Sequence, residues 1–155
     1  MDFYDDSGFE PDRSVGYLVR RVHQLGSLGL EPVFADAGLT AMQWQALVTI
    51  WFGRGATAAE LARDLGHDKG AMTRLIDALE ARGWVERRRD AAGDRRRIAL
   101  VLTDTGEAVA MAAKQRVIAC WNGWLADWNH DDVETLIALL TRLRATLAKA
   151  DPTCA

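Results

Sequence analysis

The chain has 155 residues, which is enough for one domain with a hydrophobic core. Hydrophobic residues make up 49% and charged residues 26%, as in soluble globular proteins, and no apolar run reaches the roughly 20 residues that a membrane helix needs. The net charge of −3 excludes a chain that is basic throughout, but residues 57–97 carry ten Arg or Lys against eight Asp or Glu, and such a local excess is what meets phosphate.

The first predicted helix follows a short acidic segment. Residues 1–12 lack any hydrophobic period, so we expect a flexible tail there. Over residues 15–25 apolar side chains recur every three or four positions, which predicts an amphipathic helix that Pro32 bends or interrupts. Thr40 and Gln43 have the spacing of a capping box and predict the start of a second helix.

Two short helices with a tight connection are expected next. Thr57 and Glu60 form a capping box for the first helix, and Gly66 ends it. Asp68 can cap the second helix, which runs to about Arg82. Two short helices joined by a three- or four-residue turn with glycine are typical of a helix-turn-helix.

The second of these helices has two distinct sides. Its apolar positions recur at i, i+3, i+4 and i+7 and must face the core: Met72, Leu75, Ile76 and Leu79. The start of the helix and its opposite side supply the candidate DNA contacts: Asp68, Lys69, Gly70, Thr73 and Arg74. Asp77 suits phosphate poorly, so we expect it to orient an arginine or to lie beyond the groove. The alternative interpretation of this side is an ordinary solvated helix face.

A hairpin rich in arginine follows. Residues 84–89 and 96–102 predict two strands joined by the polar connector 90–94, and a hairpin at this place is the wing of a winged helix. Six arginines crowd it: Arg87, Arg88, Arg89, Arg95, Arg96 and Arg97. So many like charges in one place favour a polyanionic partner. An arginine at the hairpin tip suits the minor groove of DNA, and Asp94 would hold that side chain in an extended conformation. The alternative is a basic hairpin that faces only solvent.

Two long helices end the chain. The first is expected over residues 104–127, and Asn129 or Asp131 caps the second. Apolar residues line one side of the second helix over residues 133–147. That side needs a partner surface, which a second copy of the chain would supply through a symmetric contact. The alternative is a helix pair within one chain.

Several of these segments together resemble the MarR family of bacterial transcriptional regulators. The resemblance rests on Gly-Ala-Met-Thr-Arg at residues 70–74, Gly-Trp-Val-Glu-Arg at 83–87, Asp-Arg-Arg at 94–96 and Leu-Thr-Asp-Thr-Gly at 102–106. It implies a mainly α fold with a small β-hairpin wing, forming a single MarR-like domain over residues 13–155. Within it, the winged helix-turn-helix covers about 40–103 and the dimerisation helices about 14–35 and 104–150.

The resemblance also implies a function. Such regulators are homodimers that bind double-stranded DNA at a pseudo-palindrome, usually as repressors, and many release it when a small aromatic ligand binds. Thr73 and Arg74 match recognition-helix positions, and Asp94 with Arg96 matches the wing-tip pair. Gly93 departs from the connector that the family often has. The arginine at the wing tip therefore stays open among Arg95, Arg96 and Arg97.

The family's ligand pocket lies between the dimer helices and the winged domain. Arg20, His23, Trp44 and Trp51 are candidate lining groups because they come from the two helices that are expected to meet there. A Trp face would stack on an aromatic ligand, and Arg20 could bind its carboxylate. The alternative is that the Trp residues fill the core and the dimer interface.

Other chemistries find little support in the sequence. The chain starts without the basic and apolar stretches of a signal peptide, and Cys120 and Cys154 form no CxxC motif, so we expect a reduced, cytoplasmic protein without redox control. The three histidines form no metal-ligand cluster, and we expect no metal or cofactor. No HExxH, GxSxG or P-loop is present, so an enzyme is not expected. The remaining alternative is a winged-helix module that binds proteins, or chromosomal DNA without sequence preference, and has no ligand control.

Overall fold

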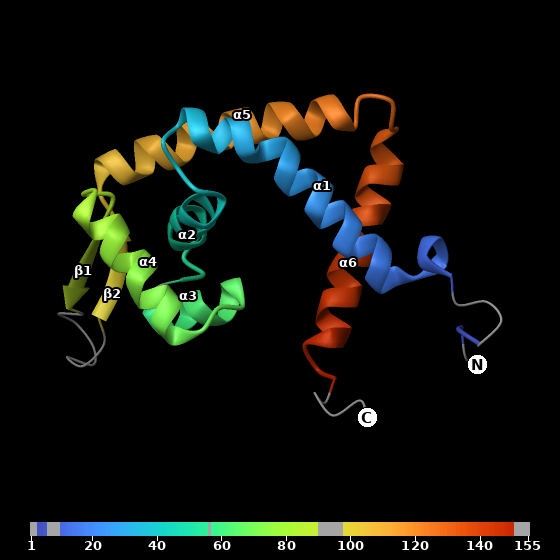
Figure 1. Cartoon of the computed structure of the whole chain (residues 1–155), viewed down its shortest axis with the longest axis horizontal. Coiled ribbons are helices and arrows are strands. Elements are labelled where there is room, and N and C mark those ends of the chain that lie inside the picture. The colour runs from blue at the N-terminus through green and yellow to red at the C-terminus, as the bar shows by residue number, and fades with distance from the viewer. Residues whose placement is uncertain (1–2, 6–9, 56, 90–97, 151–155) are drawn as a thin grey trace. The chain divides into compact units, whose positions relative to one another are not determined.

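The computed structural model describes residues 3–5, 10–55, 57–89 and 98–150 and has the expected fold, which is mainly α with one antiparallel hairpin (Figure 1). The elements in chain order are η1 (Pro11–Arg13), α1 (Val15–Asp36), α2 (Ala41–Trp51), α3 (Ala58–Leu65), α4 (Lys69–Ala81), β1 (Val85–Arg89), β2 (Ile98–Leu102), α5 (Asp104–Trp124) and α6 (His130–Leu147). The chain falls into two compact units, Met1–Val117 and Ile118–Ala155. Helix α5 therefore begins in the first unit and ends in the second.

Side-chain caps fix where helices α2, α3, α4 and α6 begin. Thr40 and Gln43 form a complete capping box, in which each side chain bonds the backbone amide of the other residue. The Thr57 hydroxyl and the Asp68 carboxylate accept hydrogen bonds from backbone amides at the starts of α3 and α4. Asn129, rather than Asp131, caps α6. Each cap satisfies an amide that the first helical turn leaves without a partner, so these starts were predictable from local sequence.

Helix α1 continues through Pro32, so of the bend or interruption that was expected there, the interruption does not occur. A proline inside a helix removes one backbone hydrogen bond and costs about 3 kcal/mol or more. Tertiary contacts on the next turn offset this cost. Val33 and Phe34 are buried, and the Arg116 guanidinium donates to the Asp36 carboxylate at 2.7 Å and to the Val33 carbonyl at 3.4 Å.

Before α1, part of the predicted tail packs against the helix start. Residues 11–13 form the short helix η1, and the Tyr4 hydroxyl accepts a hydrogen bond from the backbone amide of Val15 at 2.9 Å.

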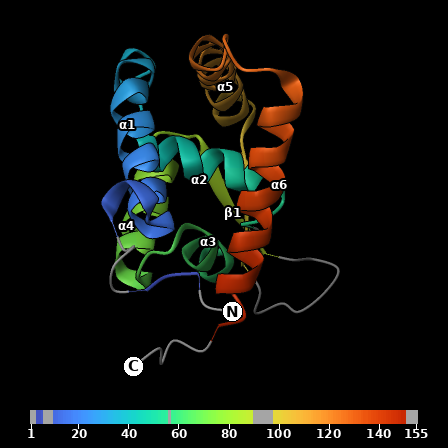
Figure 2. The ribbon, with the colours of Figure 1, turned by 90° about the vertical axis from the view of Figure 1, so that its right-hand side faces the viewer.

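The core of the first unit lies where α2, α3 and α4 meet. Helix α2 passes above α3 in Figure 2, and the two are in contact. The largest fully buried side chains come from these three helices: Leu47, Leu61, Met72, Ile76 and Leu79. The predicted inward side of α4 is therefore confirmed, with Leu75 only half-buried. Burial of each such side chain stabilises the unit by about 1.5–3 kcal/mol.

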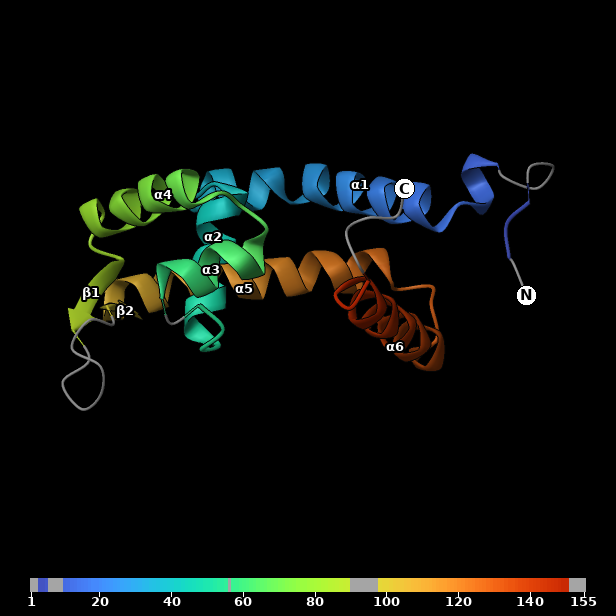
Figure 3. The same ribbon diagram turned by 90° about the horizontal axis from the view of Figure 1, so that it is seen from below.

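The two strands pair antiparallel, with Val85 opposite Leu102 and Arg89 opposite Ile98. Figure 3 shows β1 leaving the end of α4, with β2 beside it. Trp84, Val85 and Leu100 are buried at the base of the hairpin. The strand side chains therefore anchor the hairpin to the helix-turn-helix.

The second unit exposes many apolar side chains. Helix α6 has no buried residue in the single chain, and Trp128, Ile137 and Leu140 are 50%, 52% and 44% exposed. Trp121 and Trp124 pack edge to face, with ring centroids 5.0 Å apart, and both remain exposed. An apolar surface of this extent is typical of a binding interface. Among the helices that the structure describes, none is long and apolar enough to span a membrane.

Candidate nucleic-acid interface

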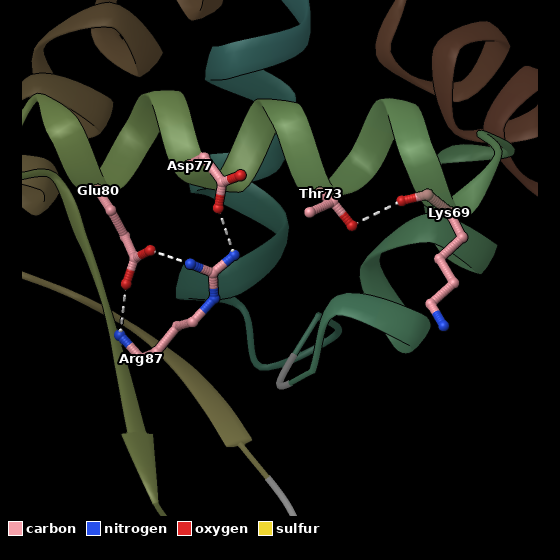
Figure 4. A network of polar contacts seen from close by, with 5 residues as sticks. All are labelled: Lys69, Thr73, Asp77, Glu80 and Arg87. Atoms are coloured by element: carbon pink, nitrogen blue, oxygen red, sulfur yellow. Dashed lines mark hydrogen bonds and ion pairs between the residues drawn. The ribbon is translucent and has the colours of Figure 1, made fainter.

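The outer side of α4 presents the residues predicted to bind DNA. Lys69, Gly70, Thr73 and Arg74 are all exposed, whereas the opposite side of the helix is sealed in the core. Figure 4 shows the Lys69 side chain extending away from the helix. The structure thus brings these predicted residues to one accessible surface, which we call the α4 face (Lys69, Gly70, Thr73 and Arg74).

Asp68 lies just before this face, and its side chain caps α4. Its carboxylate accepts a hydrogen bond from the Ala71 amide at 2.9 Å, and this bond holds the pKa of Asp68 below its usual value. A Cβ at Gly70 would lie 3.2 Å from the same carboxylate, so glycine gives the cap room. Because the Asp68 carboxylate occupies the amide end of α4, that helix terminus is not free to bind an anion.

Arg87 connects the wing to α4. Its guanidinium forms ion pairs with Asp77, at 2.8 Å, and with Glu80, and its backbone amide donates to the Glu80 carboxylate at 3.1 Å (Figure 4). The prediction that Asp77 orients an arginine is therefore confirmed. Arg87 itself was predicted to bind DNA, but its side chain is 32% exposed and joins β1 to α4. In this arrangement Arg87 links the wing to α4, and its contact with DNA stays a prediction.

A second arginine, which sequence reasoning did not single out, holds the other end of α4. The Arg82 guanidinium donates to the Gly38 carbonyl at 2.6 Å and lies 3.8 Å above the centre of the buried Trp84 ring. Gly38 has a φ of +65°, which places it in the left-handed turn between α1 and α2. Arg82 therefore joins the α1–α2 turn, the end of α4 and the start of the wing through one side chain.

The junction between the wing and α5 is equally tight. The Thr103 hydroxyl donates to the Gly83 carbonyl at 2.6 Å and accepts from the Gly106 amide at 3.0 Å. A Cβ at Gly106 would lie 1.9 Å from the Trp84 carbonyl oxygen. That distance is too short for any side chain unless the backbone moves. Gly106 thus allows α5 to begin directly against the backbone of Trp84, between α4 and β1.

Comparison with known proteins decides the family. Residues 37–97 match the family model described as MarR family. The multiple antibiotic resistance protein MarR of Escherichia coli strain K12 is 33% identical over 130 residues, which cover 83% of this chain and 90% of that protein. The chain belongs to the MarR family. The predicted resemblance is therefore confirmed.

Solved structures of MarR-family regulators have the same fold. A mutant of Escherichia coli MarR complexed with operator DNA is 31% identical, covers 83% of this chain and 92% of its own, and gives a TM-score of 0.71. The transcriptional repressor CouR bound to a 23-mer DNA duplex is 27% identical, covers 91% and 99%, and gives a TM-score of 0.75.

The wing tip lies outside the described residues. Asp94, Arg95, Arg96 and Arg97 all fall within residues 90–97, so their DNA-binding roles stay predictions from the sequence.

The residues predicted to line a MarR-family ligand pocket have separate surroundings. Trp44 is half-buried, donates to the Ala110 carbonyl at 3.3 Å and packs against Phe34. Arg20 lies over the ring of Tyr17, 5.3 Å from its centre, and His23 is exposed. These contacts favour a packing role for Trp44.

Trp51 is the predicted ligand residue that borders a cleft. The cleft has a volume of about 220 Å³ and lies between α2, β2 and α5; its lining is Ile50, Trp51, Leu100, Val101, Leu102 and Glu107. The Trp51 indole donates to the Glu107 carboxylate at 3.2 Å, and the Lys114 ammonium lies 4.9 Å from the ring centre. Pockets for drug-sized ligands run from about 300 to 1,000 Å³, so this cleft is smaller than such a pocket.

Proposed function

We propose that this MarR-family chain is a homodimeric, sequence-specific repressor that binds a pseudo-palindromic operator and releases it when a small aromatic ligand binds. The observation that carries the proposal is the α4 face, which is exposed and polar while the reverse side of the helix is fixed in the core. Two relatives that bind DNA in their solved structures support it.

The roles on the α4 face follow from side-chain chemistry. We assign phosphate binding to Lys69, whose ammonium extends from the first turn of α4 (Figure 4). Arg74, one turn further along, has the planar fork that pairs with guanine in the major groove. Thr73 lies beside it on the same exposed surface. Arg87 supports these contacts by holding the wing against α4.

A dimer would supply a second copy of the α4 face. The exposed apolar side chains of α6, and the exposed Val22, Leu25 and Leu28 of α1, would be covered by the same surfaces of a second copy. Two copies of α4 related by a two-fold axis would enter successive major grooves about 34 Å apart. A pseudo-palindromic operator follows from that symmetry.

The ligand part of the proposal rests on Trp51. Its ring gives a flat surface for stacking, and Lys114 beside the ring supplies a positive charge for an aromatic carboxylate. The test adds benzoate or a hydroxybenzoate to the DNA complex and measures release. Trp51→Ala should abolish the response while Trp44→Phe keeps it. Equal responses in the two variants would place the ligand elsewhere.

The DNA part is tested by footprinting on the intergenic DNA next to the protein's own gene. At physiological salt the dimer should protect two half-sites and prefer this fragment at least ~10³-fold over random duplex. The binding constant should fall steeply with salt because counterions are released from phosphate. Equal affinity for random DNA would favour a non-specific chromosome-binding module, and no binding at low salt would reject the proposal.

A further inference from the structure

Thr73 stands in the middle of the α4 face, yet its hydroxyl is already engaged. The hydroxyl oxygen donates its hydrogen to the Lys69 carbonyl, one turn earlier in the same helix, at 2.9 Å (Figure 4). A threonine hydroxyl has one hydrogen to donate and two lone pairs that accept. With this bond in place, the oxygen can only accept from DNA.

That restriction excludes phosphate as a partner of the Thr73 hydroxyl. Phosphate oxygens are acceptors, so they need a donor that Thr73 has already used. In the major groove the donors are the amino groups of cytosine and adenine, and the remaining group specific to one base is the thymine methyl. Besides the hydroxyl, the side chain of this exposed residue ends in a methyl group, which takes no part in the bond to the helix.

We propose that Thr73 reads a thymine through contact between the two methyl groups, and does not bind phosphate. This specificity role rests on the proposed function of α4 as the recognition helix. The neighbouring Arg74 then supplies a polar base contact, and Thr73 adds an apolar one. The pairing is consistent with the exposure of both side chains on one helical turn.

Two substitutions separate the methyl from the hydroxyl. Thr73→Val keeps the methyl and the branched shape and removes the hydroxyl. The Lys69 carbonyl keeps its ordinary helical partner, so valine leaves no buried acceptor unpaired. Thr73→Ser keeps the hydroxyl and removes the methyl. The two variants should therefore behave in opposite ways.

The experiment is uracil interference on the intergenic DNA fragment, in which single thymines are replaced by deoxyuridine and lose only their methyl group. Wild-type protein should bind about fourfold more weakly when one particular thymine of a half-site is replaced, as expected for one buried methyl-sized group. Thr73→Val should show the same interference at the same thymine. Thr73→Ser should bind thymine and uracil there equally.

Thr146 provides a matched control. Its hydroxyl also donates to the carbonyl one turn earlier, that of Arg142, at 3.0 Å, but it lies in α6. Thr146→Ser should leave the interference pattern unchanged.

The outcomes are distinct. If wild-type protein binds no DNA, the proposed function fails and this inference falls with it. If it binds but no thymine is sensitive to its methyl group, the inference alone is overturned. The same holds if Thr73→Ser keeps the interference or if Thr73→Val loses it.

Discussion

Helices α4 and α6 are both amphipathic, but the single chain buries the apolar side of only one of them. Three residues of α4 are buried, and Ile76 among them is 0% exposed, whereas no residue of α6 is buried and Leu140 is 44% exposed. The apolar side of α4 thus finds its partners within the chain and leaves a polar side accessible. The apolar side of α6 is not covered by other residues of the single chain, which indicates a contact with another molecule. A helix whose apolar side is buried within the chain can present a fixed recognition surface. A helix whose apolar side is still exposed can form a dimer contact.

The largest expected effect tests the α4 half of this comparison. Ile76→Ala should lower the free energy of unfolding by about 2–5 kcal/mol because it leaves a cavity in a filled core. Urea denaturation followed by far-UV circular dichroism measures the loss. Val109→Ala, at a half-buried site in α5, is the control and should cost clearly less. A loss below that of the control would mean that α4 is not anchored as the structure indicates.

The second prediction tests the α6 half. Leu140→Glu should weaken the dimer by at least tenfold, since it places a charge in the apolar contact. Sedimentation velocity over a range of protein concentrations measures the dissociation. Ala138→Glu introduces the same charge on the opposite side of α6 and should leave the dimer intact. A dimer that survives Leu140→Glu places the interface elsewhere.

The third prediction concerns Arg82, which holds α4 in position. Arg82→Ala should cost about 1 kcal/mol of stability, the value of one hydrogen bond, and should weaken DNA binding although Arg82 lies off the α4 face. Arg82→Lys should recover part of the stability through its charge but not the flat stacking on Trp84. Hydrogen exchange gives the decisive readout. Faster exchange of the Arg82 and Trp84 amides, which bond the last turn of α4, should accompany the loss of binding. Unchanged exchange with weaker binding would mean that Arg82 contacts DNA directly.

The sequence predicted most of what is local and periodic. The caps at Thr40 and Asp68, the inward side of α4 and the place of the hairpin all follow from residues within one or two helical turns of each other. Pairings between distant segments could not be predicted in this way. The bond between Arg82 and Gly38 joins positions 44 residues apart, and no spacing rule connects them. The continuation of α1 through Pro32 could not be predicted for the same reason, because the contacts of Arg116 that stabilise this helix come from α5.

Arg87 shows what the sequence could not predict about the site. Counting arginines in the hairpin treated them as equivalent, but two carboxylates of α4 lie within reach of Arg87 and partly neutralise it. Composition gives the number of charges near DNA and not which of them are already paired.

The smallest expected effect is on the salt dependence of DNA binding, which distinguishes a paired arginine from an unpaired one. For each phosphate contact that is lost, the slope of log K against log salt should fall by about 0.9. Arg96→Ala, at one of the three candidate wing-tip positions, should reduce the slope by that amount for each half-site. Arg87→Gln should leave the slope nearly unchanged, because Asp77 and Glu80 already balance its charge, and should instead lower the melting temperature slightly through the loss of the wing anchor. Titrations of the intergenic fragment at several salt concentrations compare the two variants directly. If Arg87→Gln flattens the slope as much as Arg96→Ala does, then Arg87 exchanges its carboxylate partners for phosphate when DNA binds, and the wing anchor must break in the complex.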